Sequence, residues 1–163
     1  MRTRLAWFAM LALVVGLVSA GSVAAAGDTV VLTARLVGAQ EVPPADPDGV
    51  AKATIHVNVT AGEVCFEIKN VKDTETPNRG HIHHAPTGQN GPIVVPFFEL
   101  RPGDATVNDP RHDEIESGSI EDCVPGDPAI LADIVAHPDQ YYVNVHNTRF
   151  PGGVLRCVLE ARG

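Results

Sequence analysis

The chain lacks the sequence signatures of several enzyme classes. It has no Cys-x-x-Cys pair, which argues against a thiol–disulfide oxidoreductase. Beyond residue 26 only two serines occur, Ser117 and Ser119, and neither lies in a Gly-x-Ser-x-Gly motif. No glycine-rich phosphate loop is present, and the acidic residues between 104 and 122 lack the spacing of a calcium-binding loop. The sequence therefore gives little support for nucleophilic catalysis, nucleotide binding or calcium binding.

Aromatic and basic side chains are also scarce. Aromatic residues make up 5% of the chain, and the single tryptophan, Trp7, lies in the N-terminal segment, so residues 27–163 lack the indole on which many glycan-binding sites stack sugars. Residues 27–163 carry ten basic and 20 acidic side chains, a net charge of −10 with histidine neutral. A surface of this charge repels nucleic acids and anionic membranes. We therefore expect no nucleic-acid partner.

Residues 1–26 have the layout of a secretory signal peptide. Arg2 and Arg4 precede an apolar run from residue 5 to residue 18, and small residues follow as far as Ala26. About 14 apolar residues are too few for a typical bilayer span. We expect cleavage near Ala26 and a mature chain, residues 27–163, that forms a single domain without a transmembrane span. Its location would be secreted: extracellular, periplasmic or associated with the cell envelope.

Three cysteines follow the signal segment: Cys65, Cys123 and Cys157. An exported protein meets oxidising conditions, so one disulfide and one leftover thiol is the simplest arrangement. The spacing allows three pairings and does not choose among them, and three buried free thiols remain an alternative.

Alternation of apolar and polar residues dominates the mature chain, and this period of two predicts half-buried β-strands. The predicted strands cover residues 30–36, 54–60, 64–69, 141–146 and 154–160. One short helix is predicted after Asp127, because aspartate is a favourable N-cap, Pro128 suits the first turn, and an apolar stripe follows before His137. Residues 101–122 are predicted to form a long loop, with one strand around residues 115–120.

Two short segments combine this strand pattern with metal-binding side chains. If residues 81–84 and 142–146 form strands, His81 and His83 share one face of the first, and His146 comes from the second. Histidine is the commonest transition-metal ligand in proteins. The three histidines could converge on a metal ion. The alternative is a solvated sheet face whose histidines hydrogen-bond to one another and to the backbone.

Five motifs occur in order along the chain. They are Gln40-Glu41-Val42-Pro43-Pro44, His81-Ile82-His83, Asn90-Gly91-Pro92, Tyr142-Val143-Asn144-Val145-His146 and Pro151-Gly152-Gly153. Together they resemble the CHRD domain, the module named after chordin, over residues 29 to 160. The resemblance implies an all-β extracellular module. With the strand pattern, it predicts an antiparallel, Greek-key-like β-sandwich with one short helix.

The resemblance also bears on the cysteines. Secreted single-domain bacterial members have cysteines similar to Cys65 and Cys123, whereas their last strand usually reads Arg-Gly where this chain has Arg156-Cys157. The resemblance therefore implies a Cys65–Cys123 disulfide and leaves Cys157 free or capped. Alternation places Cys157 on the core face with Leu155 and Leu159.

The leading hypothesis is an exported, non-enzymatic binding module for an unknown extracellular ligand or protein. Its site would be His81, His83 and His146, where neutral imidazoles favour copper or zinc over calcium. Glu41, in a segment stiffened by two prolines, or a water would complete the metal shell. One alternative is a structural or adhesive domain with no metal. The other is a redox metalloenzyme analogous to copper/zinc superoxide dismutase, another β-sandwich with a His-x-His strand.

Overall fold

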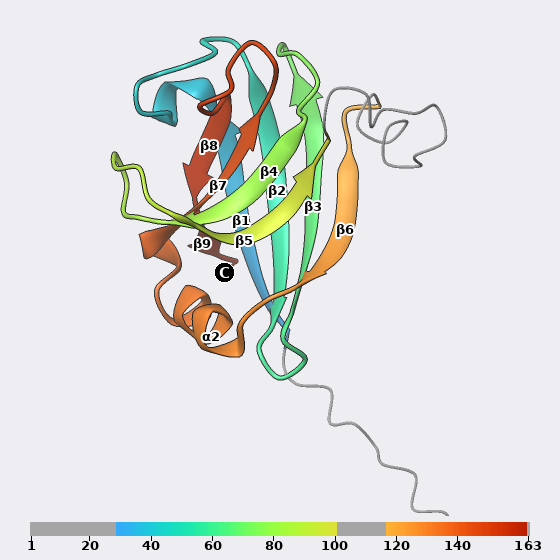
Figure 1. Ribbon diagram of the computed structural model, residues 1–163, viewed down its shortest axis with the longest axis vertical. Helices are drawn as coiled ribbons and strands as arrows, with labels where there is room; N and C mark the ends of the chain where they lie inside the picture. The colour runs from blue at the N-terminus through green and yellow to red at the C-terminus, as the bar shows by residue number, and fades with distance from the viewer. Residues whose placement is uncertain (1–28, 101–116, 163) are drawn as a thin grey trace, which may run out of the picture.

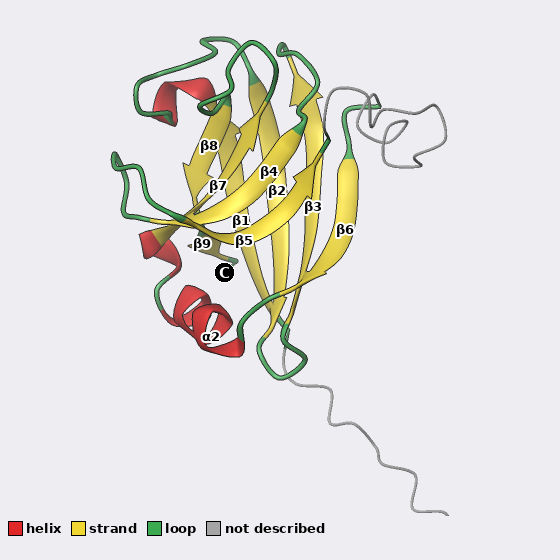
Figure 2. Cartoon of the chain, in the orientation of Figure 1, coloured by secondary structure: helices red, strands yellow, loops and turns green. Residues whose placement is uncertain are grey.

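The computed structural model describes residues 29–100 and 117–162 (Figure 1). Figure 2 shows that these residues form mainly strands, with short helical segments. The elements are β1 (Val30–Val37), η1 (Gly38–Gln40), β2 (Val50–Asn58), β3 (Glu63–Lys72), β4 (Arg79–His84), β5 (Ile93–Glu99), β6 (Ile120–Pro125), α2 (Pro128–Ala136), η2 (Pro138–Gln140), β7 (Tyr141–His146), β8 (Leu155–Val158) and β9 (Glu160–Ala161). The predicted signal peptide, residues 1–26, lies outside the described residues.

The described strands pair in the order β5-β4-β7-β8-β1-β2-β3-β6, and β9 pairs with β1. Every one of these pairings is antiparallel. Figure 1 shows β4, β5 and β7 crossing in front of β1, β2 and β3. Phe66 on β3 stacks on Phe97 on β5, with ring centroids 4.3 Å apart, so the two layers share one core. The predicted Greek-key-like β-sandwich is confirmed.

The period of two in the sequence explains which side chains fill this core. On β2, Ile55 and Val57 are fully buried, while His56 between them is exposed. Strand β7 departs from this pattern, because all six of its residues are buried. Its apolar face lies in the core, and its polar face is covered by loops. The burial of this polar face was not expected from the alternation of the sequence.

The helix matches its prediction. The backbone N–H of Ala129 donates to the Asp127 carboxylate at 2.8 Å, which satisfies one of the free donors of the first turn. Leu131 and Ile134 are fully buried, and the helix ends at Ala136, one residue before His137. In Figure 1, α2 lies at the lower end of the two layers.

Three expectations about strand positions need correction. Strand β5 was not predicted; it contains Pro96, whose missing N–H is tolerated because β5 lies at the edge of the sheet. The strand expected around residues 115–120 within the loop over residues 101–122 begins only at Ile120, as β6, and runs on to Pro125. Residues 101–116 lie outside the described part. The last predicted strand is divided into β8 and β9, with Leu159 between them.

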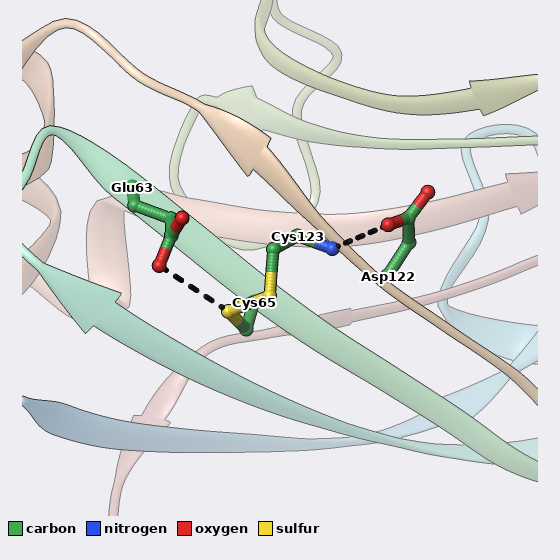
Figure 3. Close-up of a disulfide and its surroundings, with 4 residues drawn as sticks. All are labelled: Glu63, Cys65, Asp122 and Cys123. Atoms are coloured by element: carbon green, nitrogen blue, oxygen red, sulfur yellow. Dashed lines mark hydrogen bonds between the residues drawn. A yellow bond between two sulfur atoms is a disulfide. The ribbon is translucent and has the colours of Figure 1, made fainter.

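The structure joins Cys65 to Cys123 by a disulfide across β3 and β6 (Figure 3). The two cysteines are direct partners in the register of these strands, on the face opposite to the buried Val64 and Phe66. Cys157 is free and partly buried against the core. Of the helices in the described residues, none has the length and apolar character needed to cross a membrane.

Candidate metal centre

The pairing of β4 with β7 brings the three histidines together. His146 is opposite Arg79, and His81 is opposite Asn144, so His146 lies diagonally next to His81 on the same face. The ring centroid of His81 is 5.1 Å from that of His146 and 5.5 Å from that of His83. Each of the three residues offers one ring nitrogen, and these nitrogens lie within 4.8 Å of one another. The convergence expected from the sequence is therefore present in the geometry.

Backbone carbonyls fix the orientation of two of the rings. Nδ1 of His83 lies 2.9 Å from the Gly91 carbonyl oxygen, and Nδ1 of His146 lies 3.0 Å from the Pro151 carbonyl oxygen. A carbonyl only accepts, so Nδ1 carries the proton in each neutral ring and Nε2 holds the lone pair. Metal-binding histidines are commonly held in this way through their second nitrogen.

Three ring nitrogens in this cluster are buried and have no hydrogen-bond partner: Nε2 of His83, Nε2 of His146 and Nδ1 of His81. Most buried side-chain polar atoms have a partner, so an unpaired one calls for a specific explanation. The rings meet edge to face, with interplanar angles of 88° and 70°. A hydrogen-bond network among the histidines does not satisfy these nitrogens.

The surroundings keep the rings neutral. Burial, together with the charge on His146, His83 and Arg79, lowers the pKa of His81 to about 4. Burial likewise lowers the pKa of His146 to about 4, although its hydrogen bond to Pro151 acts in the opposite direction. The pKa of His83 is also lowered, mainly by burial. Neutral imidazole is the form that binds metals.

Glu41 lies in a neighbouring polar network rather than among the histidines. Its Oε1 accepts from the Asn144 side-chain amide, and its Oε2 is 3.9 Å from Nε of Arg156. Burial raises the pKa of Glu41 to about 7, even though Arg156 and Asn144 favour the charged form. Glu41 does not belong to the group of ligand atoms within 4.8 Å of one another.

Arg156 organises this network, and the sequence analysis did not single it out as a site residue. Its guanidinium donates to the backbone carbonyls of Gln40 and Gln89 and, at 2.8 Å, to the Asn90 side chain. It also lies over the ring of Tyr142, 4.7 Å from the centroid. The residues before and after Arg156 in β8, Leu155 and Cys157, are apolar, so alternation alone would have placed Arg156 on a solvated face.

A comparison with protein-family models matches residues 32–159 to the CHRD domain. The protein belongs to the CHRD-domain family. No match was found among curated proteins or among solved structures. The matched range contains the three histidines, Glu41 and Arg156.

The motif residues of this CHRD domain meet around the histidine cluster. Tyr142 stacks on His83 with ring centroids 4.8 Å apart, and its hydroxyl accepts from the Gly91 backbone N–H at 3.3 Å. Asn90 donates to the Val42 carbonyl at 2.9 Å and so ties two loops together. The remaining motif residues, Pro43, Pro44, Pro151 and Gly152, line a cavity of about 350 Å³ beside Glu41.

Close packing explains why one of these positions is glycine. A Cβ atom on Gly91 would lie 1.9 Å from the backbone oxygen of His84, which is far inside van der Waals contact. The small residue lets the loop approach β4 closely enough for the Gly91 carbonyl to accept from His83. His84 itself is exposed and stacks on Tyr141, outside the cluster.

Proposed function

We propose that this CHRD domain is an exported binding module that holds one copper or zinc ion between His81, His83 and His146. The three buried ring nitrogens without hydrogen-bond partners carry the proposal. Leaving a buried polar atom unpaired costs about 1–3 kcal/mol. With the proton of His81 on Nε2, a metal ion would give all three nitrogens a partner at once, whereas a structural or adhesive role gives them none.

The geometry requires only a small adjustment of the rings. Zinc binds imidazole nitrogen at about 2.0–2.1 Å, so two ligand nitrogens of a tetrahedral site are about 3.3 Å from each other. One ring nitrogen from each histidine lies within 4.8 Å of the other two, and modest side-chain rotation would close the difference. Water would fill the fourth position, since Glu41 would have to leave Asn144 to reach the ion.

The ligand set suits either metal. Imidazole nitrogen binds both zinc and copper well. Three neutral ligands leave the full charge of the ion in a buried site, where Arg79 and Arg156 are already positive. Bound hydroxide would lower the net charge of a divalent ion, and monovalent copper would carry less charge from the start.

Export is supported by two separate features. Residues 1–26 have the charged, apolar and small-residue regions of a signal peptide. The Cys65–Cys123 disulfide fits an oxidising compartment outside the cytosol.

The test is calorimetric titration of tag-free protein with Cu²⁺ and Zn²⁺. His83→Ala and His146→Ala each remove a ligand of the metal. Each should therefore weaken metal affinity by more than about 10–100-fold, the usual effect of losing only a hydrogen bond that supports a ligand. His84→Ala is the matched control: it removes an imidazole from the same strand but from outside the cluster, and it should leave binding unchanged. Tight binding that survives both ligand substitutions would refute the proposal.

A second measurement separates binding from catalysis. Copper-loaded protein is assayed for superoxide dismutation, with free Cu²⁺ and the His146→Ala variant as controls. If the protein is a binding module, the copper-loaded wild type should show no more superoxide dismutation than the His146→Ala variant. Dismutation that rises with copper occupancy of the site would favour the redox metalloenzyme.

A further inference from the structure

A second set of metal-binding residue types lies on the outer face of β2, β3 and β6. In register, Cys65 has His56 as its partner on one side and Cys123 on the other. Directly opposed residues of antiparallel strands point to the same face. The three side chains therefore form one row across three strands.

A carboxylate completes this row. Glu63 lies two residues before Cys65 on the same face of β3, and its Oε1 is 3.7 Å from the Cys65 sulfur (Figure 3). The ligand atoms of Glu63, Cys65 and Cys123 all lie within 4.8 Å of one another.

The row is open to solvent and lies in acidic surroundings. His56, Cys65 and Cys123 line a surface cavity of about 370 Å³, and His56 and Cys123 are exposed. The other lining residues with charge are all acidic: Glu67, Glu121 and Asp122. Lys69 pairs with Glu67 and Glu121, but the carboxylates outnumber it, and grouped carboxylates raise the local concentration of cations. Both a reductant and a metal ion could therefore reach the sulfurs.

We propose that this row is a redox-gated metal site, in which the reduced chain binds a zinc ion through Cys65 and Cys123, with Glu63 as the third ligand. His56 lies outside the group of ligand atoms within 4.8 Å of one another, and its side chain would turn toward the ion as the fourth ligand. Two thiolates with nitrogen and oxygen donors form a four-ligand set of the kind zinc takes in proteins. The disulfide and the metal exclude each other, because each sulfur is either bonded to the other sulfur or available to the ion.

The chemistry balances with a dithiol as the reductant. One thiolate of the dithiol attacks the disulfide, a mixed disulfide forms, and the second thiolate displaces the remaining protein sulfur. The dithiol is oxidised by two electrons to its cyclic disulfide, and Cys65 and Cys123 are reduced to two thiols. Zinc binding then releases two protons from these thiols.

The backbone geometry allows the change. In a tetrahedral zinc site with Zn–S bonds of about 2.3 Å, the two sulfurs are about 3.7 Å apart. Side-chain rotation can supply this separation while β3 and β6 stay paired through their backbone hydrogen bonds. The site is independent of the three-histidine centre, which lies on β4 and β7.

The experiment uses Co²⁺ as a spectroscopic probe of thiolate ligands, in the full mature chain carrying Cys157→Ser so that only two cysteines remain. The protein is reduced with dithiothreitol, the reductant is removed without air, and Co²⁺ is added. Reduced protein should show sulfur-to-cobalt charge-transfer absorption, and Zn²⁺ should abolish it. The oxidised protein should show none. His56→Ala should weaken cobalt binding at least tenfold, and Cys123→Ser should remove most of the absorption.

Two further measurements keep the outcome decisive. His146→Ala in the same background should leave the absorption unchanged, so the result does not depend on the three-histidine centre. In the reduced chain, Zn²⁺ should slow alkylation of both cysteines, as read by mass spectrometry. The proposal is overturned if the reduced chain shows no thiolate absorption, if the absorption survives Cys123→Ser, or if reduction in the presence of metal abolishes the β-sheet circular dichroism.

Discussion

Two adjacent glycines give a sharp test of the packing around the candidate metal centre. Gly153 has a φ of +137°, in a region that L side chains rarely adopt. A Cβ atom there would lie 2.7 Å from Oε2 of Glu41 and 2.8 Å from the amide nitrogen of Asn144. A Cβ atom on Gly152 would meet nothing within 4 Å. Gly153→Ala should therefore be destabilising, and Gly152→Ala should not.

The magnitude follows from two contributions. A non-glycine residue held in this backbone region costs about 1–3 kcal/mol. Moving Glu41 or Asn144 away from the new methyl group weakens the bond between them, for about 1 kcal/mol more. We expect a total of about 2–4 kcal/mol, which at about 4 °C per kcal/mol lowers Tm by roughly 8–16 °C. The Gly152 variant should stay within about 0.5 kcal/mol of the wild type.

Urea unfolding and thermal melts of the metal-free protein measure both variants. Repeating Gly153→Ala in a Glu41→Ala background removes the carboxylate contact, while the backbone strain and the close approach to Asn144 remain. The cost should fall by about 1 kcal/mol in that background. Equal stability of the Gly152 and Gly153 variants would refute the account of this loop.

Two further predictions concern charged and titratable side chains at the candidate metal centre and in the polar network beside it. The folded-state pKa of His146 is about 4, below its ordinary value of 6.5, so between pH 6.5 and pH 4 the unfolded chain binds more protons than the folded protein. As pH falls through this window, the unfolding free energy of the metal-free protein should drop by up to about 3 kcal/mol because of this residue. His146→Gln should make the fall in urea midpoint shallower, and an unchanged slope would contradict the assignment. Arg156→Lys should lower stability by about 2–3 kcal/mol, because a single ammonium cannot reach the three acceptors that the guanidinium serves. The exposed Arg35→Lys is its control and should change the unfolding free energy by less than about 0.5 kcal/mol.

The fold was predictable where one face of a strand meets the core and the other meets water. Ile55 and Val57, with the exposed His56 between them, show the alternation on which such predictions depend. Strand β5 was not predicted, and its Pro96 is compatible with a strand only because β5 lies at the sheet edge, a position that the local sequence does not reveal. Sheet order is a property of the whole chain, so local sequence does not contain it.

The candidate site was predictable to a similar extent. The spacing of His81 and His83 and the polar face of β7 led to three converging histidines. The role of Arg156 did not follow from its sequence position, because it depends on acceptors from loops 66 to 116 residues away in the chain. The disulfide between Cys65 and Cys123 came from the family resemblance, since the spacing of three cysteines allows three pairings.

The burial of both faces of β7 connects the fold to the proposed function. A polar strand face that loses contact with water must find partners in the loops that cover it, and here Gly91 and Pro151 supply carbonyls for two of the histidines. Those bonds satisfy one nitrogen of each ring and leave the other turned toward the cluster. The same loops exclude the water that would otherwise hydrate these nitrogens. Covering this face with loops therefore places the dehydrated Nε2 lone pairs of His83 and His146 beside the unpaired Nδ1 of His81, an arrangement whose cost a bound metal ion would offset.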